Sequence, residues 1–259
     1  MMASIIKSKS FRIAFTVLFW TAVWYIAALA IGSEYFLPYP HSAALALFRL
    51  FGESVFWKSI GHSFFTILSG CLLGCILGIL MAAGAAYSRL MHSVIAPMIT
   101  VLRATPVASF IILVYVIVRR IDLNVSAVSL VIVVIMVIPI IYTNLYTAFT
   151  SFDKKLTEVA RIYQFSFWKK ISILWFPQTK PYLVSSVSNA LGYAWKAGVA
   201  AEVICILPYT IGKNLYDAKY NLEMDRLFAW TITVVLLSLF FEFLLKRTVN
   251  TKRQGGGKK

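Results

Sequence analysis

The sequence lacks the residue groupings on which enzymes and metalloproteins depend. Its three cysteines show no Cys-x-x-Cys spacing, and its three histidines, His41, His62 and His92, lie far apart. Neither a metal-ligand cluster nor a Ser-His-Asp grouping is therefore visible. No Gly-x4-Gly-Lys-Ser/Thr stretch occurs either, which argues against a phosphate-binding loop. We expect no catalysis, no metal site and no cofactor in this chain.

Acidic residues are also scarce, because 10 Asp and Glu stand against 25 Lys and Arg, for a net charge of +15. Such a charge can indicate a nucleic-acid-binding protein. Here, however, most basic residues lie in segments that would share one side of a membrane with the N-terminus. Cytoplasmic loops of membrane proteins carry this excess. We therefore expect both termini in the cytoplasm and no nucleic-acid partner.

Apolar residues are abundant, since 60% of the chain is hydrophobic and the mean hydropathy is +0.79. A helix of about 20 apolar residues crosses a bilayer core, and no short alternating pattern indicates barrel strands. The first apolar run is too long and too aromatic for a cleaved signal peptide. The sequence predicts an all-α membrane protein with six transmembrane helices, at about 13–32, 62–86, 94–118, 124–149, 182–205 and 226–245.

These spans and the segments between them divide the chain into parts. The expected parts are an N-terminal tail with the first span (1–32), an outer interfacial segment (33–60), a core (61–245) with a polar loop (151–181), and a basic cytoplasmic tail (246–259).

Small residues recur in the second span, where Gly70, Gly74 and Gly78 are four residues apart. Glycines at this spacing let two helices approach closely in lipid. We interpret them as a packing seam. A seam along which helices slide during gating is the alternative.

Polar residues inside two spans are candidates for a transport path. Arg103 lies about ten residues into the third span, roughly 15 Å deep at 1.5 Å per residue, and a cation there is costly unless it faces protein or water. Pro106 is expected to break that helix. For Arg103, the alternative is snorkelling or a structural pair with a carbonyl. For Lys196 and Glu202, the alternative is ion pairs that lock helices together or side chains that reach the outer interface. The candidate path or gate residues are Arg103, Thr105, Pro106, Asn189, Trp195, Lys196 and Glu202.

The polar segment 151–181 carries six Lys and Arg between the fourth and fifth spans. Asp153 is expected to cap a first short helix, and a second is expected at 167–176, ended by Pro177. Two such helices would form a cytoplasmic docking knob, or alternatively a pair lying on the membrane. The first helix would have an apolar stripe of Leu156, Val159, Ile162 and Tyr163.

Several motifs follow one another in a fixed order. Glu158-Val-Ala160, followed by Leu174-Trp-Phe176-Pro177, is similar to the EAA loop of ABC-importer permeases. Leu102-Arg103-Ala-Thr-Pro106 resembles the LRxxPP motif of that family. The remaining matches are YFLPYP to LPSP, Leu191-Gly-Tyr-Ala-Trp195 through Glu202 to LGxAWxxxVxAE, and Ile211-Gly212 with Ala218 to GLGxxIxxA. Their order resembles the nitrate, sulfonate and taurine branch of binding-protein-dependent permeases with the MetI-like fold.

The resemblance implies a transport system of several chains. Two ATP-binding subunits would bind ATP and Mg inside the cell, a soluble binding protein would deliver the solute outside, and a second permease copy would complete a homodimer. The membrane would be the bacterial cytoplasmic (inner) membrane. The solute would be small and anionic or polar: sulfonate-, nitrate- or taurine-like, or a small vitamin precursor. The residues implied in ATPase coupling are Glu158, Val159, Ala160, Ile162, Tyr163, Gln164, Phe167 and Pro177.

The chain departs from the family pattern at three positions. Gln164 stands where the loop has Gly, and because Gln tolerates left-handed conformations poorly, we expect an ordinary turn there. Val159 replaces the first Ala of the EAA motif. Val107 follows Pro106 and replaces the second Pro of the LRxxPP motif.

Two other functions compete with this interpretation. An ion-coupled secondary transporter needs a coupling carboxylate and often an internal repeat, but Glu202 is the only mid-chain candidate and no repeat is visible. A membrane enzyme needs a catalytic grouping, which the scattered histidines do not form. We favour the permease.

Overall fold

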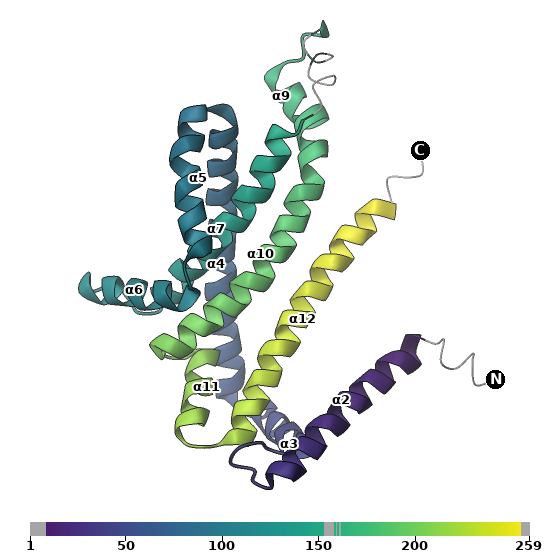
Figure 1. Cartoon of the computed structure of the whole chain (residues 1–259), viewed down its shortest axis with the longest axis vertical. Helices are drawn as coiled ribbons and strands as arrows, with labels where there is room; N and C mark the ends of the chain where they lie inside the picture. Colours follow the sequence, from purple (N-terminus) through teal and green to yellow (C-terminus); the bar gives the residue numbers. More distant parts are fainter. Residues whose placement is uncertain (1–8, 153–157, 159, 161, 255–259) are drawn as a thin grey trace, which may run out of the picture.

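The computed structural model describes residues 9–152, 158, 160 and 162–254, and this part of the chain is helical apart from short turns (Figure 1). The predicted cap Asp153 and the coupling residue Val159 lie outside the described residues. The elements are α2 (Lys9–Ile31), α3 (Pro40–Phe51), α4 (Ser54–Tyr87), α5 (Arg89–Ala104), α6 (Val107–Arg120), α7 (Ala127–Thr150), α9 (Phe167–Lys170), the π-helix η1 (Ile171–Trp175), α10 (Phe176–Cys205), α11 (Ile211–Tyr220) and α12 (Met224–Gln254).

Four described helices are long and apolar enough to cross a membrane: α2, α4, α7 and α12. Helices α5 and α6 add a fifth span only if the two are counted together, and they meet at 106°. Helix α10 has 30 residues but is too polar to join this group. The prediction of six transmembrane helices is therefore not confirmed, because the third predicted span is broken and the fifth carries Ser, Asn, Lys and Glu side chains.

The core is built on the contact between α4 and α7, with α10 packed against α7. The predicted glycine seam lies at this contact. A Cβ on Gly70, Gly74 or Gly78 would lie 2.8 Å from α7, against the Leu130 carbonyl oxygen or the Cβ of Val137 or Ile141. The packing interpretation is confirmed, because these two backbones approach closely only where side chains are absent.

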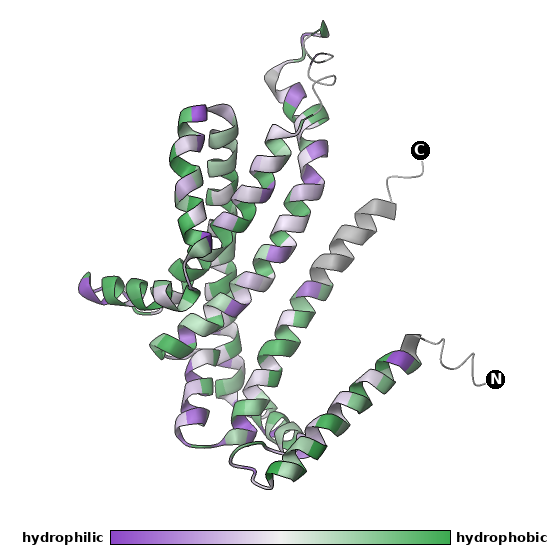
Figure 2. Ribbon diagram, in the orientation of Figure 1, coloured by the Kyte–Doolittle hydropathy of each residue, from purple (hydrophilic) through white to green (hydrophobic). Residues whose placement is uncertain are grey.

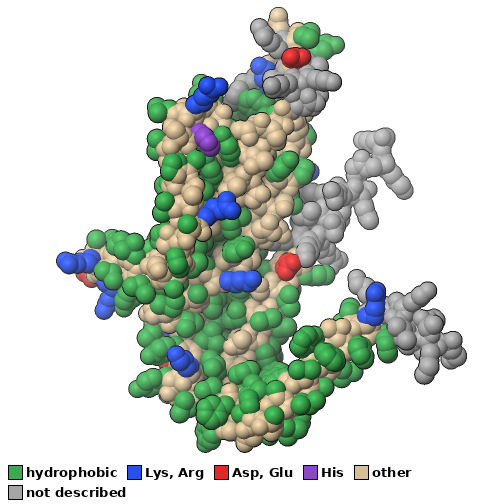
Figure 3. All heavy atoms as spheres, in the orientation of Figure 1, with side chains coloured by type: hydrophobic (Ala, Val, Ile, Leu, Met, Phe, Trp, Pro, Cys, Tyr) green, Lys and Arg blue, Asp and Glu red, His purple; other side chains and the backbone are tan. Residues whose placement is uncertain are grey.

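Helix α2 stands apart from this core and reaches it through α3 and α12 (Figure 1). The Trp24 indole N–H donates to the Pro38 carbonyl at 3.0 Å, and its ring stacks on Phe228 at 5.6 Å. Most of α2 is exposed, and hydrophobic residues cover it as they cover α4 and α7 (Figure 2). The space-filling view shows the same apolar surface (Figure 3). Such a surface fits a lipid environment.

Candidate functional site

The predicted coupling segment lies at one tip of the molecule, next to α9 and far from α11 (Figure 1). Glu158 and Ile162 are helical, and Glu158 is exposed. Ile162 and Tyr163 are 76% and 71% exposed, whereas Ala160 is 1% exposed. The segment therefore exposes a large aliphatic and an aromatic side chain, and aromatic residues are enriched at protein–protein interfaces.

Gln164 has a φ of 48°, so the expectation of an ordinary turn is wrong. The Phe165 N–H donates to the Ala160 carbonyl at 2.9 Å, the bond that closes a Schellman motif around a left-handed residue. A left-handed residue with a side chain costs roughly 1–2 kcal/mol. The helix-end bond offsets part of this cost, and Gln164 thus adopts a conformation that glycine would adopt at little cost.

Pro177 does not end a helix, contrary to the prediction. The chain is helical from Phe167 through η1 into α10, and Pro177 lies in the first turn of α10. In η1 the Phe176 N–H donates to the Ile171 carbonyl, a wider turn than the α-helical one. We attribute the continuity to this widening, because a proline ring clashes with the carbonyl four residues before it in an ordinary helix.

Pro106 breaks the third predicted span, as expected. Helix α5 ends at Ala104 and α6 begins at Val107, at 106° to it. The Thr105 hydroxyl donates back to the Val101 carbonyl at 2.9 Å, which satisfies one acceptor at the helix end. Arg103, just before the break, is exposed. The bend and an exposed cation thus occur together within the third predicted span.

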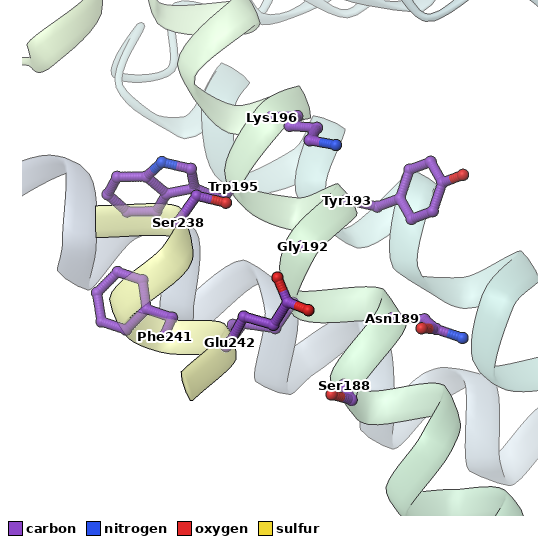
Figure 4. Close-up of a pocket in the computed structure, with 10 residues that line it drawn as sticks. Ser188, Asn189, Gly192, Tyr193, Trp195, Lys196, Ser238, Phe241 and Glu242 are labelled. Atoms are coloured by element: carbon purple, nitrogen blue, oxygen red, sulfur yellow. The ribbon is translucent and has the colours of Figure 1, made fainter. Parts of the chain in front are cut away.

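A hollow of about 260 Å³ separates α10 from α12. Three predicted path residues, Asn189, Trp195 and Lys196, line it, whereas Arg103, Thr105 and Pro106 do not. Figure 4 shows the side chains of α10 and α12 that border this space. The lining residues are Ser188, Asn189, Leu191, Gly192, Tyr193, Trp195, Lys196, Ser238, Phe241 and Glu242.

Trp195 closes one side of the hollow. Its ring is 3% exposed, its Nε1–H donates to the Val234 carbonyl on α12 at 3.1 Å, and it packs against Phe241 at 5.3 Å between centroids. An indole held by a hydrogen bond to a neighbouring helix fixes the distance between the two helices. Trp195 therefore joins α10 to α12 and forms an apolar wall.

Glu202 lies away from the hollow and is fully buried. Its Oε2 accepts from the Ser63 hydroxyl of α4 at 2.8 Å and from the Gly212 N–H at the start of α11 at 3.2 Å. Ser63 in turn accepts from the Ile211 N–H at 3.0 Å. Within the described part of the chain, Oε1 has no hydrogen-bond partner. Glu202 thus joins three helices through hydrogen bonds.

The turn between α10 and α11 is strained at two residues. Ile206 and Tyr209 have φ values of 53° and 61°, a region that β-branched and bulky residues rarely occupy. Glu202 and Gly212 lie on either side of this turn, and a Cβ on Gly212 would lie 2.3 Å from the Glu202 Cβ. The Glu202 hydrogen bonds hold the turn closed, which lets the strain persist.

Two site residues escaped the sequence analysis. Glu242 is a carboxylate inside the predicted sixth span, and a charge at such a position is a signal that could have identified it. Ser63 is an ordinary hydroxyl in an apolar span. Its role depends on Glu202, 139 residues away, which no local pattern reveals.

Comparisons with known proteins agree with the helical architecture. Residues 74–253 match the family described as "binding-protein-dependent transport system inner membrane component". The chain is 27% identical over 212 residues to the "putative aliphatic sulfonates transport permease protein SsuC" of Bacillus subtilis. The aligned region covers 82% of this chain and 75% of that protein. It is 28% identical over 172 residues to the "nitrate import permease protein NrtB" of Synechococcus elongatus, covering 66% and 58%.

A solved structure shares the fold. A chain of the MetNI methionine ABC transporter, in an inward-facing conformation, superimposes with a TM-score of 0.59 over 75% of this chain and 93% of that chain, at 15% sequence identity. Over the matched three-quarters of this chain, the two proteins share a fold.

Proposed function

We propose a function from one premise: the chain belongs to the family of binding-protein-dependent transport system inner membrane components, whose pattern it matches over residues 74–253. It is a multi-pass membrane protein and a permease component of the ABC-importer family. Beyond this, we propose that it forms the path for a small anionic or polar solute. The similarity to sulfonate and nitrate permeases carries this proposal.

The proposed system contains the partners implied by the sequence. Two ATP-binding subunits bind ATP and Mg, a second copy of the chain completes a homodimer, and an extracytoplasmic binding protein delivers the solute. The chain lies in a bacterial cytoplasmic membrane with both termini in the cytoplasm. The exposed Ile162 and Tyr163, at the tip beside α9, support docking of an ATP-binding subunit there. Gln164 and Pro177 are also exposed, and we include them, together with Phe167, in the proposed docking segment.

The proposed path follows the polar groups of the bent segment and of α10. Arg103, Thr105 and Pro106 form one part of it, and Asn189 and Lys196 another. The exposed cations Arg103 and Lys196 favour an anionic group on the solute. Trp195 and Glu202 are buried, so we assign them the task of holding the helices that border the path.

The coupling proposal is tested by Glu158→Lys. Reversing an exposed charge on a docking surface replaces attraction by repulsion, so we expect at least about tenfold less ATP-binding subunit to co-purify, about 1.4 kcal/mol. The measurement is affinity purification of the permease co-expressed with both ATP-binding subunits. Lys219→Glu, an exposed charge reversal on α11 at the opposite end, is the control. Equal recovery from the two variants would contradict docking at this tip.

The path proposal is tested by Arg103→Ala. Removing a cation that attracts an anionic solute should lower ATP-driven uptake about tenfold, the factor that about 1.4 kcal/mol represents, while the complex still assembles. Uptake of labelled taurine, an aminoalkanesulfonate, by proteoliposomes containing the full complex measures this. Arg120→Ala, another exposed arginine at the end of α6, is the control. Uptake that matches the control variant would remove Arg103 from the path.

A further inference from the structure

Gly192 is a helical glycine that helix packing does not explain. A Cβ on Gly74 or Gly198 would lie 2.8 or 2.5 Å from a neighbouring helix, so those glycines are needed for close packing. A Cβ on Gly192 would meet no atom within 4 Å. Glycine inside a helix costs about 1 kcal/mol relative to alanine. Gly192 borders the hollow between α10 and α12 (Figure 4). The absence of a side chain at this position leaves the hollow open.

The hollow carries charges of both signs. Lys196, one turn beyond Gly192 on α10, and Glu242 on α12 both line it. Among the residues that the structure describes, Lys196 takes part in none of the ion pairs. Charged side chains in helices of a membrane protein are costly unless they face a polar space. A space that displays an ammonium and a carboxylate offers that environment.

The remaining lining suits a small polar molecule. Ser188 and Asn189 lie one turn before Gly192, and Ser238 lies one turn before Glu242, so hydroxyl and amide groups accompany both charges. Trp195 forms an apolar wall on the side of the hollow away from Asn189 (Figure 4). The volume of about 260 Å³ lies just below the range of roughly 300–1,000 Å³ for sites that hold drug-sized ligands.

We infer that this hollow binds a small zwitterion, a short chain with an ammonium group at one end and a sulfonate or carboxylate at the other. Lys196 pairs with the anionic end and Glu242 with the ammonium. An inorganic anion such as nitrate could pair with Lys196 but has no group that could donate to the Glu242 carboxylate. The inference rests on the proposed function, because it places a binding station for the solute on α10, and it narrows the solute to molecules that carry both charges.

The test is direct binding to the purified full chain in lipid nanodiscs. The probes are taurine and β-alanine, which carry both charges, and ethanesulfonate, which lacks the ammonium. We expect saturable binding of at least one zwitterion by the unmodified chain. Gly192→Leu should fill the hollow and weaken that binding at least about tenfold. Gly61→Leu is the control, because a Cβ on Gly61 of α4 would also meet no atom within 4 Å, yet Gly61 does not line the hollow.

The role of Glu242 is tested by a separate variant, measured with the same probes. Glu242→Gln should weaken binding of the zwitterion by at least about tenfold while ethanesulfonate binds as well as before, because only the zwitterion has an ammonium group that pairs with the carboxylate. An equal effect on both probes would overturn the assignment of the ammonium to Glu242.

Other results would overturn the site as a whole. One such result is the absence of saturable zwitterion binding by the folded, unmodified chain. A second is the same affinity in Gly192→Leu as in Gly61→Leu. A third is dissociation of a homodimer by Gly192→Leu, which would make the hollow an interface between copies.

The proposed function fails separately. If zwitterions bind but no ATP-binding subunit associates, the importer assignment fails and the site stands; if the subunits associate and no zwitterion binds, only the site fails.

Discussion

Gly74→Leu should leave almost no folded protein in the membrane. A Cβ at this position would lie 2.8 Å from the Val137 Cβ and 3.2 Å from the Val134 carbonyl oxygen, and leucine adds three further carbons. Neither α4 nor α7 can retreat locally, because Gly70 and Gly78 hold the same two helices at the same separation. Overpacking of a core costs about 1–3 kcal/mol or more, and here the insertion separates the central helix pair.

The measurement for Gly74→Leu is the yield of monodisperse protein after extraction in a mild detergent, followed by unfolding in denaturant. Gly61→Leu is the matched control, since it makes the same chemical change on the same helix where no atom lies within 4 Å. We expect the control to be stable within about 1 kcal/mol, the range typical of surface substitutions. Equal yields from the two variants would mean that α4 and α7 do not pack through this seam.

Glu202→Ala should lower the free energy of unfolding by about 3 kcal/mol. The substitution leaves the Gly212 N–H without its buried acceptor and removes the Ser63 hydroxyl's acceptor, and a buried polar group left unsatisfied costs about 1–3 kcal/mol. It also empties a fully buried volume beside the strained turn at Ile206. The reconstituted chain's denaturant midpoint and slope measure this change.

Glu202→Gln separates hydrogen bonding from charge at the same site. Its amide oxygen can accept from both Ser63 and Gly212, and its volume is nearly that of Glu, so we expect a loss below about 1 kcal/mol. If Gln proves as destabilising as Ala, the negative charge rather than the two hydrogen bonds holds this junction. If Ala is as stable as the unmodified chain, Glu202 does not fasten α10 to α4 and α11.

The bend at Pro106 and the glycine seam could be predicted because each depends on the chemistry of one residue type. A proline removes a backbone donor wherever it occurs, and glycines four apart share one helix face. The coupling turn could not be predicted in the same way. Gln164 adopts a left-handed conformation because the Phe165 N–H reaches the Ala160 carbonyl, and residue type alone favoured the opposite outcome.

The candidate site shows the same difference between what the sequence predicts and what only the structure decides. The sequence singled out Lys196 and Glu202 as charged residues in a predicted transmembrane span, but it could not separate their roles. The structure places Lys196 on the hollow and Glu202 on α4 and α11, because helical rotation and the neighbouring helices determine which space each side chain enters.

By itself the sequence determined a helical membrane chain, since hydrophobic runs and basic loops are properties of consecutive residues. It also held the motifs of the family, which record composition and spacing. Tertiary structure alone decided that Gly192 borders a hollow, that Glu242 faces the same space as Lys196, and that Ser63 bonds to Glu202. Those facts concern residues far apart in the chain, and only packing brings such residues together.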